Sequence, residues 1–236
     1  LEKVEGGDQV HVAEGEYHGK LKTGRWKLSV PRVSLIGGYD AQFKERNPWK
    51  HPTRLFAPAD YKGRRDGYVV QGADDHTGAV VDGFVFDRQT DNQYKPSGDL
   101  DYDNSEKIEH LWLSKPDCVI RNNLFVNGAE GSVRVGSGNT LENNIFVNHH
   151  LRTVVVQRGF GNAPIVLRNN TFAFAWDIRF GQGNGRNGHL LSIENGVNAI
   201  IDNNIFEFAD NDAIRLMAAP GDVEQFVPRH HDLRAV

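Results

Sequence analysis

Short apolar runs recur along the chain in groups of three, and the third run of each group follows two consecutive asparagines. Examples are "RNNLFVN" at 121–127 and "ENNIFVN" at 142–148. The pair occurs four times, with gaps of 21, 26 and 34 residues between its second members, Asn123, Asn144, Asn170 and Asn204. A motif that recurs with variable gaps predicts a coiled repeat whose turns accept loop insertions, because a solenoid of helix pairs would keep its period.

Two other apolar runs precede each asparagine-led run, and all three are short enough to be strands. The first runs are "HLWLS" 110–114, "SVRVG" 132–136, "TVVVQ" 153–157, "LLSIE" 190–194 and "AIRLM" 213–217. The second runs are "CVIRN" 118–122, "NTLEN" 139–143, "IVLRN" 165–169 and "AIIDN" 199–203. Three strands per repeat, stacked repeat on repeat, predict an all-β fold: a right-handed parallel β-helix with three strands per coil.

A sharp turn between the second and third strands would explain the recurring asparagine. After glycine, asparagine tolerates the left-handed backbone conformation best. Stacked coils would place equivalent side-chain amides about 4.8 Å apart, where they can bond to one another as an Asn ladder. The phenylalanine of each third run would then stack inward as a column. The alternative is a set of Asn-rich loops between antiparallel strands.

The repeat is less regular toward the beginning of the chain. We expect one β-helix domain over 1–236, with irregular first coils at 1–66, regular coils at 67–217, and a tail or cap at 218–236. Such solenoids need capped ends to prevent edge-to-edge pairing. The "APGDVEQFVPRHHDLRAV" segment, 219–236, could cover one end.

Composition narrows the class of protein. The 25 glycines agree with a turn-rich fold, and no apolar run is long enough to span a membrane. The net charge of −4 gives no general attraction to nucleic acid. Cys118 is the single cysteine, which excludes an internal disulfide framework, and its apolar surroundings predict a buried, inert thiol. The chain begins at Leu1 without an apolar leader, so we expect that a signal peptide was removed or the sequence trimmed.

These repeats resemble those of the pectate-lyase-like superfamily of right-handed β-helices. The segment "GGDQVHVAEGEYHG" at 6–19 is similar to the first coil of many extracellular members, and "VSLIGGYDAQFKERNPWKHPTRL" at 33–55 is similar to a segment of secreted or surface β-helix proteins of bacteria. The resemblance implies a secreted, periplasmic or cell-surface location. The superfamily includes polysaccharide lyases, glycoside hydrolases, epimerases, phage tailspikes and adhesins, so fold alone does not give function.

Two subfamily signatures are missing. The polygalacturonase set "NTD", "GHG" and "RIK" is absent, and so is the "WIDH"-like signature of pectate lyases. This leaves less stereotyped lyases and epimerases, or a protein without catalytic activity.

Candidate chemistry lies on the outward residues of the first runs, where this fold commonly holds its ligand. Alternation places Trp112, Arg134 and Arg215 outward, with Gln157 and Glu194 two residues further along their strands and His110 two residues before Trp112. Tryptophan supplies a flat face for a sugar ring, and arginine binds a carboxylate. We expect Trp112, Gln157, Arg158, Glu194 and Arg215 to bind substrate. The alternative is that these side chains are simply solvated or cover a loop.

Proton abstraction beside a uronate carboxylate needs a base and a cationic group that stabilises the resulting anion. Arg134, His110 and Lys115 are our candidates for these catalytic roles. Asp99, Asp101 and Asp103 alternate as in the first half of a calcium loop, but His110 occupies the twelfth position, where an EF-hand needs glutamate. A looser Ca²⁺ site is possible there, with a solvated acidic loop as the alternative; no other cofactor is implied.

Three functions follow as hypotheses. The first is an exported carbohydrate-active protein that acts on an acidic polysaccharide by β-elimination or a related proton abstraction, with polysaccharide lyase as the candidate enzyme class. The second is a non-catalytic glycan-binding or structural β-helix. The third is a glycoside hydrolase, which needs two carboxyl groups about 5–10 Å apart; Glu194 with an aspartate of 88–106 is the candidate pair.

Overall fold

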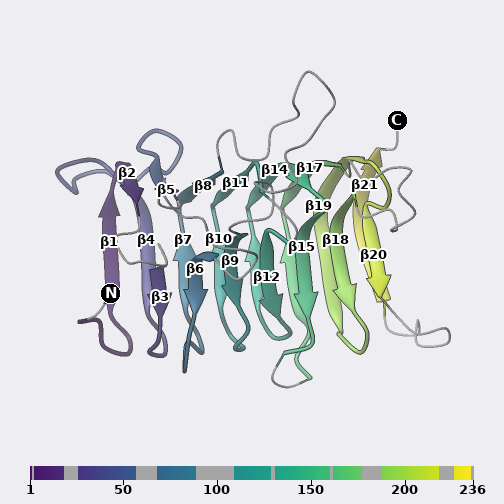
Figure 1. The fold of residues 1–236 in the computed structure, drawn as a ribbon, viewed down its shortest axis with the longest axis horizontal. Coiled ribbons are helices and arrows are strands. Elements are labelled where there is room, and N and C mark those ends of the chain that lie inside the picture. The colour runs from purple at the N-terminus through teal and green to yellow at the C-terminus, as the bar shows by residue number, and fades with distance from the viewer. Residues whose placement is uncertain are drawn as a thin grey trace, which may run out of the picture.

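The computed structural model describes residues 1, 3–18, 26–56, 68–88, 109–128, 131–159, 162–176 and 188–217, and the backbone of 226–234. These residues form strands, turns and bends, and none of them lies in a helix (Figure 1). Nothing in the described part of the chain is therefore a helix that could cross a membrane.

The structure has 21 strands among the described residues. In chain order they are β1 (Gln9–Ala13), β2 (Gly15–His18), β3 (Trp26–Leu28), β4 (Ser34–Tyr39), β5 (Thr53–Phe56), β6 (Tyr68–Gly72), β7 (Val80–Asp82), β8 (Phe84–Asp87), β9 (Glu109–Leu113), β10 (Val119–Arg121), β11 (Leu124–Val126), β12 (Val133–Gly136), β13 (Thr140–Glu142), β14 (Ile145–His150), β15 (Arg152–Gln157), β16 (Ile165–Arg168), β17 (Thr171–Trp176), β18 (His189–Glu194), β19 (Ala199–Ala209), β20 (Ile214–Met217) and β21 (Phe226–Arg234).

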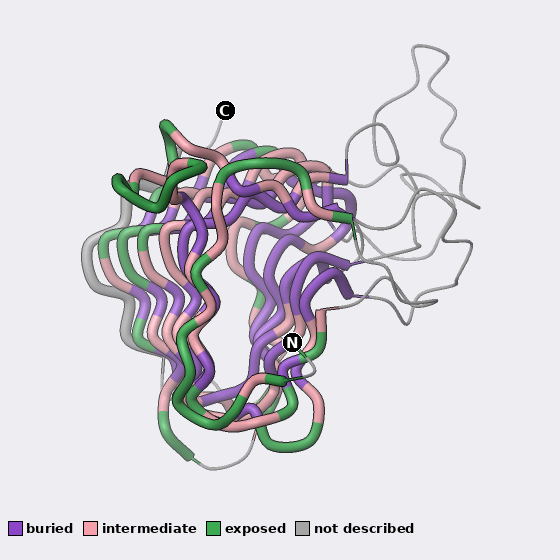
Figure 2. The backbone as a smooth tube through the Cα atoms, turned by 90° about the vertical axis from the view of Figure 1, so that its left-hand side faces the viewer, coloured by how far each residue is buried: buried purple, intermediate pink, exposed green. Residues whose placement is uncertain are grey.

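The strands form two large parallel sheets. The seven-stranded sheet has the order β20-β18-β15-β12-β9-β6-β3. The 14-stranded sheet has the order β1-β4-β7-β10-β13-β16-β19-β17-β14-β11-β8-β5-β2, and β21 pairs with β19. Seen along the long axis, successive strands superpose one behind another (Figure 2). The predicted all-β class with parallel strands is confirmed, and the arrangement is consistent with a β-solenoid.

Alternating side chains of the first runs fill the interior. Leu111 pairs with Val133, Val133 with Val154, and Val154 with Leu191, and all four are completely buried. Each of these strands presents the same inward position to its neighbour, so branched apolar side chains meet across every coil boundary. This register fixes which residues of the seven-stranded sheet face outward.

Five phenylalanines form an aromatic column inside the 14-stranded sheet: Phe86, Phe125, Phe146, Phe172 and Phe206. Neighbouring rings stack with centroids 4.7–4.9 Å apart and planes within 12° of each other. At most 1% of the surface of each is exposed. The spacing is that of hydrogen-bonded strands, so the column follows from placing one phenylalanine at the same register position of successive strands.

The two members of each asparagine pair do different things. The first members, Asn122, Asn143, Asn169 and Asn203, have φ between 52° and 55°. The second members, which we call the asparagine row, are buried, and the Nδ2 of the first three donates to the Oδ1 of the next asparagine at 2.9–3.1 Å. The Oδ1 of Asn144, Asn170 and Asn204 also accepts the backbone N–H of the preceding member of the row. One member therefore makes the turn, and the other bonds one repeat to the next.

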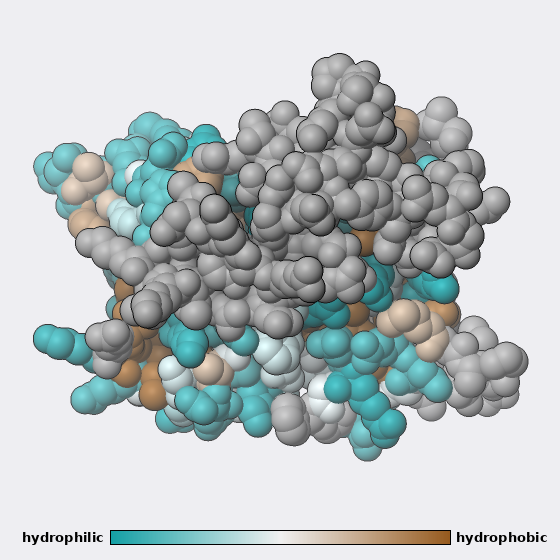
Figure 3. Space-filling view, in the orientation of Figure 1, coloured by the Kyte–Doolittle hydropathy of each residue, from teal (hydrophilic) through white to brown (hydrophobic). Residues whose placement is uncertain are grey.

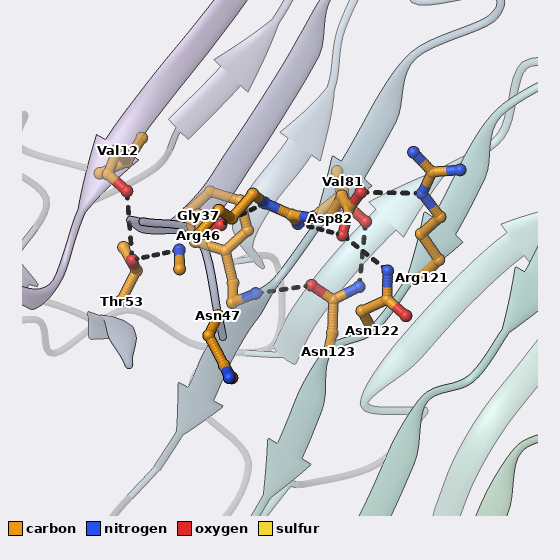
Figure 4. A network of polar contacts seen from close by, with 12 residues as sticks. Val12, Gly37, Arg46, Asn47, Thr53, Val81, Asp82, Arg121, Asn122 and Asn123 are labelled. Atoms are coloured by element: carbon orange, nitrogen blue, oxygen red, sulfur yellow. Dashed lines mark hydrogen bonds and ion pairs between the residues drawn. The ribbon is translucent and has the colours of Figure 1, made fainter. Parts of the chain in front are cut away.

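At its first member the asparagine row ends on a backbone group, because Asn123 Oδ1 accepts the N–H of Phe84. A carboxylate lies beside this end of the row: Asp82 is buried and pairs in register with Arg121 (Figure 4). This carboxylate accepts hydrogen bonds from Arg46 Nη2 at 2.5 Å, Arg121 Nε at 2.8 Å and Asn122 Nδ2 at 2.8 Å. Gly83 has φ of 83°, and a Cβ there would lie 2.8 Å from the Gly37 carbonyl oxygen. Asp82 thus joins an early loop to later strands at a point where only glycine fits beside it.

Candidate functional site

The outward side chains of the seven-stranded sheet form one row in register. We call this the outer row; it consists of Lys27, Gln71, Trp112, Arg134, Val155, Ser192 and Arg215. The predicted alternation is correct for these positions. On the face of the molecule shown in Figure 3, the described surface is mainly hydrophilic, with apolar residues scattered among polar ones.

Trp112 and Arg134 are neighbours in this row, on β9 and β12. Trp112 is half-buried and packs against Tyr68, with ring centroids 5.4 Å apart. Its indole Nε1 is buried, so the exposed part of the side chain is apolar ring. An apolar ring beside a guanidinium is the combination that the sequence predicted for this face.

A carboxylate holds the Arg134 guanidinium in place. Nε and Nη2 of Arg134 each donate to a Glu109 oxygen at 3.1 Å. Glu109 is 6% exposed, whereas the side chain of Arg134 is 21% exposed. This two-bond fork orients the guanidinium and offsets most of its charge. Sequence reasoning missed Glu109, although its position before His110 at the start of a strand was visible.

His110 does not lie on the outer face with Trp112. It is completely buried at the start of β9, and its Nδ1 lies 2.6 Å from Ser132 Oγ. The rings of Phe86, Phe125 and His149 surround it, with centroids 5.7–6.1 Å away. Burial, with smaller effects from His149 and Arg88, holds the pKa of His110 well below its usual range, so the ring is neutral near pH 7.

His149 shares this interior corner. Its Nε2 donates to the Phe125 carbonyl oxygen at 3.1 Å, and burial lowers its pKa to about 4. A Cβ on Gly128 would collide with both Ser132 Oγ and His149 Nδ1. The glycine thus provides the space for this cluster. His150, the residue after His149, is also buried and packs against Trp176.

The outer row is not one continuous exposed strip. Val155 and Ser192, which lie between Arg134 and Arg215, are 1% and 0% exposed. A ligand on the surface therefore cannot touch both Arg134 and Arg215 by following the row. The structure divides the predicted site into one patch around Trp112 and Arg134 and another around Arg215.

The second patch contains a chain of polar contacts across β18 and β20. Arg215 Nη1 lies 2.8 Å from His189 Nε2, and His189 Nδ1 lies 3.3 Å from Asp212 Oδ2. If Arg215 donates to Nε2, the neutral imidazole carries its proton on Nδ1, facing Asp212. His189 is completely buried and Arg215 is exposed, so the contact with the fixed histidine ring orients the guanidinium on the surface. Sequence reasoning missed His189 and Asp212, since no motif marks them.

The other predicted site residues lie around these two patches. The backbone N–H of Arg158 donates to Glu194 Oε2 at 3.2 Å, and Gln157 is half-buried. Lys115 is half-buried, and its backbone N–H donates to His76 Nε2 at 3.1 Å. Asp99, Asp101 and Asp103 lie outside the described residues. Within the described ranges, no group of three or more His, Cys, Asp or Glu side chains is placed to hold a metal ion.

Cys118 is buried and reduced, as predicted. Burial raises the pKa of its thiol to about 11, so almost none of it is thiolate near neutral pH. This cysteine is therefore no nucleophile in the folded protein.

Comparison with known proteins gives no match among family models, curated proteins or solved structures.

Proposed function

We propose that the protein is an exported carbohydrate-active β-helix that binds an acidic polysaccharide on the outer face of the seven-stranded sheet. The observation that carries this proposal is the pairing of Trp112 with Arg134 in adjacent register positions. A sugar ring can pack on the exposed indole while its carboxylate bonds to the neighbouring guanidinium. Secretion, a periplasmic location or a cell-surface location would bring the protein to such a polymer.

Glu109 lowers the long-range electrostatic part of the affinity that we expect for an acidic polysaccharide. Because it offsets the charge of Arg134, long-range attraction of a polyanion is weak, and short-range contacts dominate. We therefore expect binding that depends only moderately on salt. Lys27 and Gln71, next in the outer row, would extend the contact along the polymer.

β-Elimination is the reaction that this ligand class suggests, with Arg134, His110 and Lys115 as its candidate residues. The geometry supports binding more strongly than proton abstraction, since His110 is buried and bonded to Ser132. Glycoside hydrolysis would pair Glu194 with an aspartate of 88–106. Ca²⁺ at Asp99, Asp101 and Asp103 is a further proposal, independent of the binding patch.

We also propose that the fold is a right-handed coil with three strands per turn, of the pectate-lyase-like type, with an Asn ladder at one corner. The order of the strands supports this proposal. From β6 to β15, each strand of the seven-stranded sheet is followed by two strands of the 14-stranded sheet before the chain re-enters the seven-stranded sheet. The hydrogen bonds of the asparagine row add to this support.

The test measures binding and cleavage together on pectate, alginate and glycosaminoglycans, with and without Ca²⁺. Binding is read by calorimetry and cleavage by the ultraviolet absorbance of unsaturated uronates. We expect Trp112→Ala and Arg134→Gln to weaken binding about tenfold or more. The matched control is Arg168→Gln, because Arg168 forms a similar pair with Glu142 on the other sheet.

Binding without new absorbance, and without released reducing ends, would assign the non-catalytic form of the proposal. Absorbance that rises on one substrate and is lost in Arg134→Gln would assign a lyase. Failure of every polyanion to bind, or equal loss in the Arg168→Gln control, would overturn the proposal.

A further inference from the structure

A second row of residues lies within or directly after the third strand of each repeat, and its members change from asparagine to phenylalanine along the molecule. Register places Asn127, Asn148, Phe174 and Phe208 at equivalent positions, and we call them the corner row. All four have left-handed backbone, with φ between 57° and 61°. Asparagine adopts this conformation readily, whereas a bulky aromatic residue does so at a cost. The two phenylalanines are therefore not explained by the turn itself.

The amide half of the corner row is fully used in structural bonds. Asn127 Nδ2 donates to Asp87 Oδ1 at 2.8 Å, and Asn148 Nδ2 donates to Asn127 Oδ1 at 2.7 Å. Trp176 Nε1 then donates to Asn148 Oδ1 at 2.9 Å. This chain of bonds ends at the point where the aromatic half begins, and it fixes the Trp176 indole beside Phe174.

The aromatic half is exposed. Phe174 and Phe208 are 47% and 42% exposed, and their rings stack with centroids 4.8 Å apart and planes 7° apart. Two residues earlier on the same strands, Phe172 and Phe206 stack equally well but inside the core. Folding accounts for the inner pair through burial. It accounts for neither the exposure nor the backbone conformation of the outer pair, and two such residues stacked side by side on the surface suggest a ligand site.

A hollow lies beside these rings. It has a volume of about 500 Å³ and is lined by Asn148, Phe174, Ala175, Trp176, Phe208, Ala209 and Asp210. This is within the usual range for small-ligand sites, about 300–1,000 Å³. The backbone N–H of Asp210 donates to the Ala175 carbonyl oxygen at 2.8 Å, which holds this exposed residue at the rim of the hollow.

We propose that this hollow binds a neutral pyranose ring of a glycan. The aromatic rings supply apolar surface for the C–H face of the sugar. The Asp210 carboxylate accepts hydrogen bonds from hydroxyl groups, and its negative charge disfavours a uronate. The combination of flat apolar surface and a carboxylate fits a hydroxylated, uncharged ring better than an aliphatic or anionic one. The site belongs to the 14-stranded sheet and is independent of the acidic-polysaccharide patch.

The test uses neutral oligosaccharides of glucose, mannose, galactose and xylose, with binding measured by calorimetry and saturation-transfer NMR. We expect the double variant Phe174→Asn, Phe208→Asn to lose about tenfold or more in affinity. Because asparagine suits the left-handed backbone, the same variant should melt no lower than the parent protein, so lost binding cannot be assigned to unfolding.

Phe43→Asn is the matched control. Phe43 is also an exposed phenylalanine, with φ of 57°, but it lies in a distant turn, so this change should leave sugar binding unaltered. Arg134→Gln should also leave it unaltered, which separates this site from the acidic-polysaccharide patch.

Three outcomes would overturn the proposal: no binding of any neutral oligosaccharide, undiminished binding in the double variant, or self-association through this surface that the double variant abolishes.

Discussion

Replacing one asparagine of a pair should have a very different effect from replacing the other, and the pair Asn143-Asn144 gives the cleanest comparison. Asn144 is completely buried. Its Nδ2 donates to the Ile120 carbonyl oxygen and to Asn170 Oδ1, and its Oδ1 accepts from the backbone N–H and Nδ2 of Asn123. Asn143 is exposed, with φ of 54°.

The magnitude follows from these contacts. Asn144→Ala removes four side-chain hydrogen bonds, each worth about 0.5–1.5 kcal/mol net, and leaves the backbone N–H of Asn123 without its acceptor, which alone costs about 1–3 kcal/mol. Since the bonds share partners, we expect a total loss of about 3–5 kcal/mol in the free energy of unfolding. Asn143→Ala imposes left-handed backbone on alanine and should cost about 1–2 kcal/mol.

The assay is urea unfolding followed by far-ultraviolet circular dichroism, with the midpoint and slope compared between the two variants. Asn143→Gly serves as a further control, because glycine tolerates the turn, and it should cost less than Asn143→Ala. Equal losses for Asn143→Ala and Asn144→Ala would refute the reasoning, since the hydrogen bonds of the asparagine row would then carry little net stability.

Two predictions concern buried titratable groups. Because the folded pKa of His149, about 4, lies below the ordinary value of 6.5, the unfolded chain takes up a proton first as pH falls. Stability from this group is present above pH 6.5 and lost toward pH 4, by up to about 3 kcal/mol, and His149→Gln should reduce that loss in unfolding measured across the range. For Cys118, whose pKa is about 11, we expect a thiol reagent at neutral pH to react slowly with the folded protein and fast in denaturant. Rapid reaction without denaturant would contradict the burial of Cys118.

Much of the fold could be predicted because the sequence repeat places the same kind of residue at equivalent positions of successive strands. The alternation of apolar residues in "HLWLS" and "SVRVG" predicts the observed pairing of Leu111 with Val133 and of Trp112 with Arg134. The recurring phenylalanine likewise predicts the stacked column from Phe125 onward. These features depend only on a period of two within a strand and on equivalent positions in neighbouring strands.

The candidate site was less predictable, for two physical reasons. Alternation of inward and outward side chains holds in the middle of a strand but not at its ends. His110, near the start of β9, is therefore buried, although alternation would place it on the outer face with Trp112. Contacts between loop and strand also leave no periodic signal. Asp212 lies beside His189 only because the chain comes back to the same sheet after one repeat, and no motif in the residues between them indicates this contact.

The asparagine row also determines how the molecule would respond to tension. Its hydrogen bonds join residues 21, 26 and 34 positions apart, so each bonded step holds back one loop of chain of that length. Pulling on the two ends would release these loops one after another, each lengthening the chain by roughly 70–120 Å. The chain would thus yield in steps, each of which breaks one set of asparagine bonds together with the strand pairing between the same two repeats.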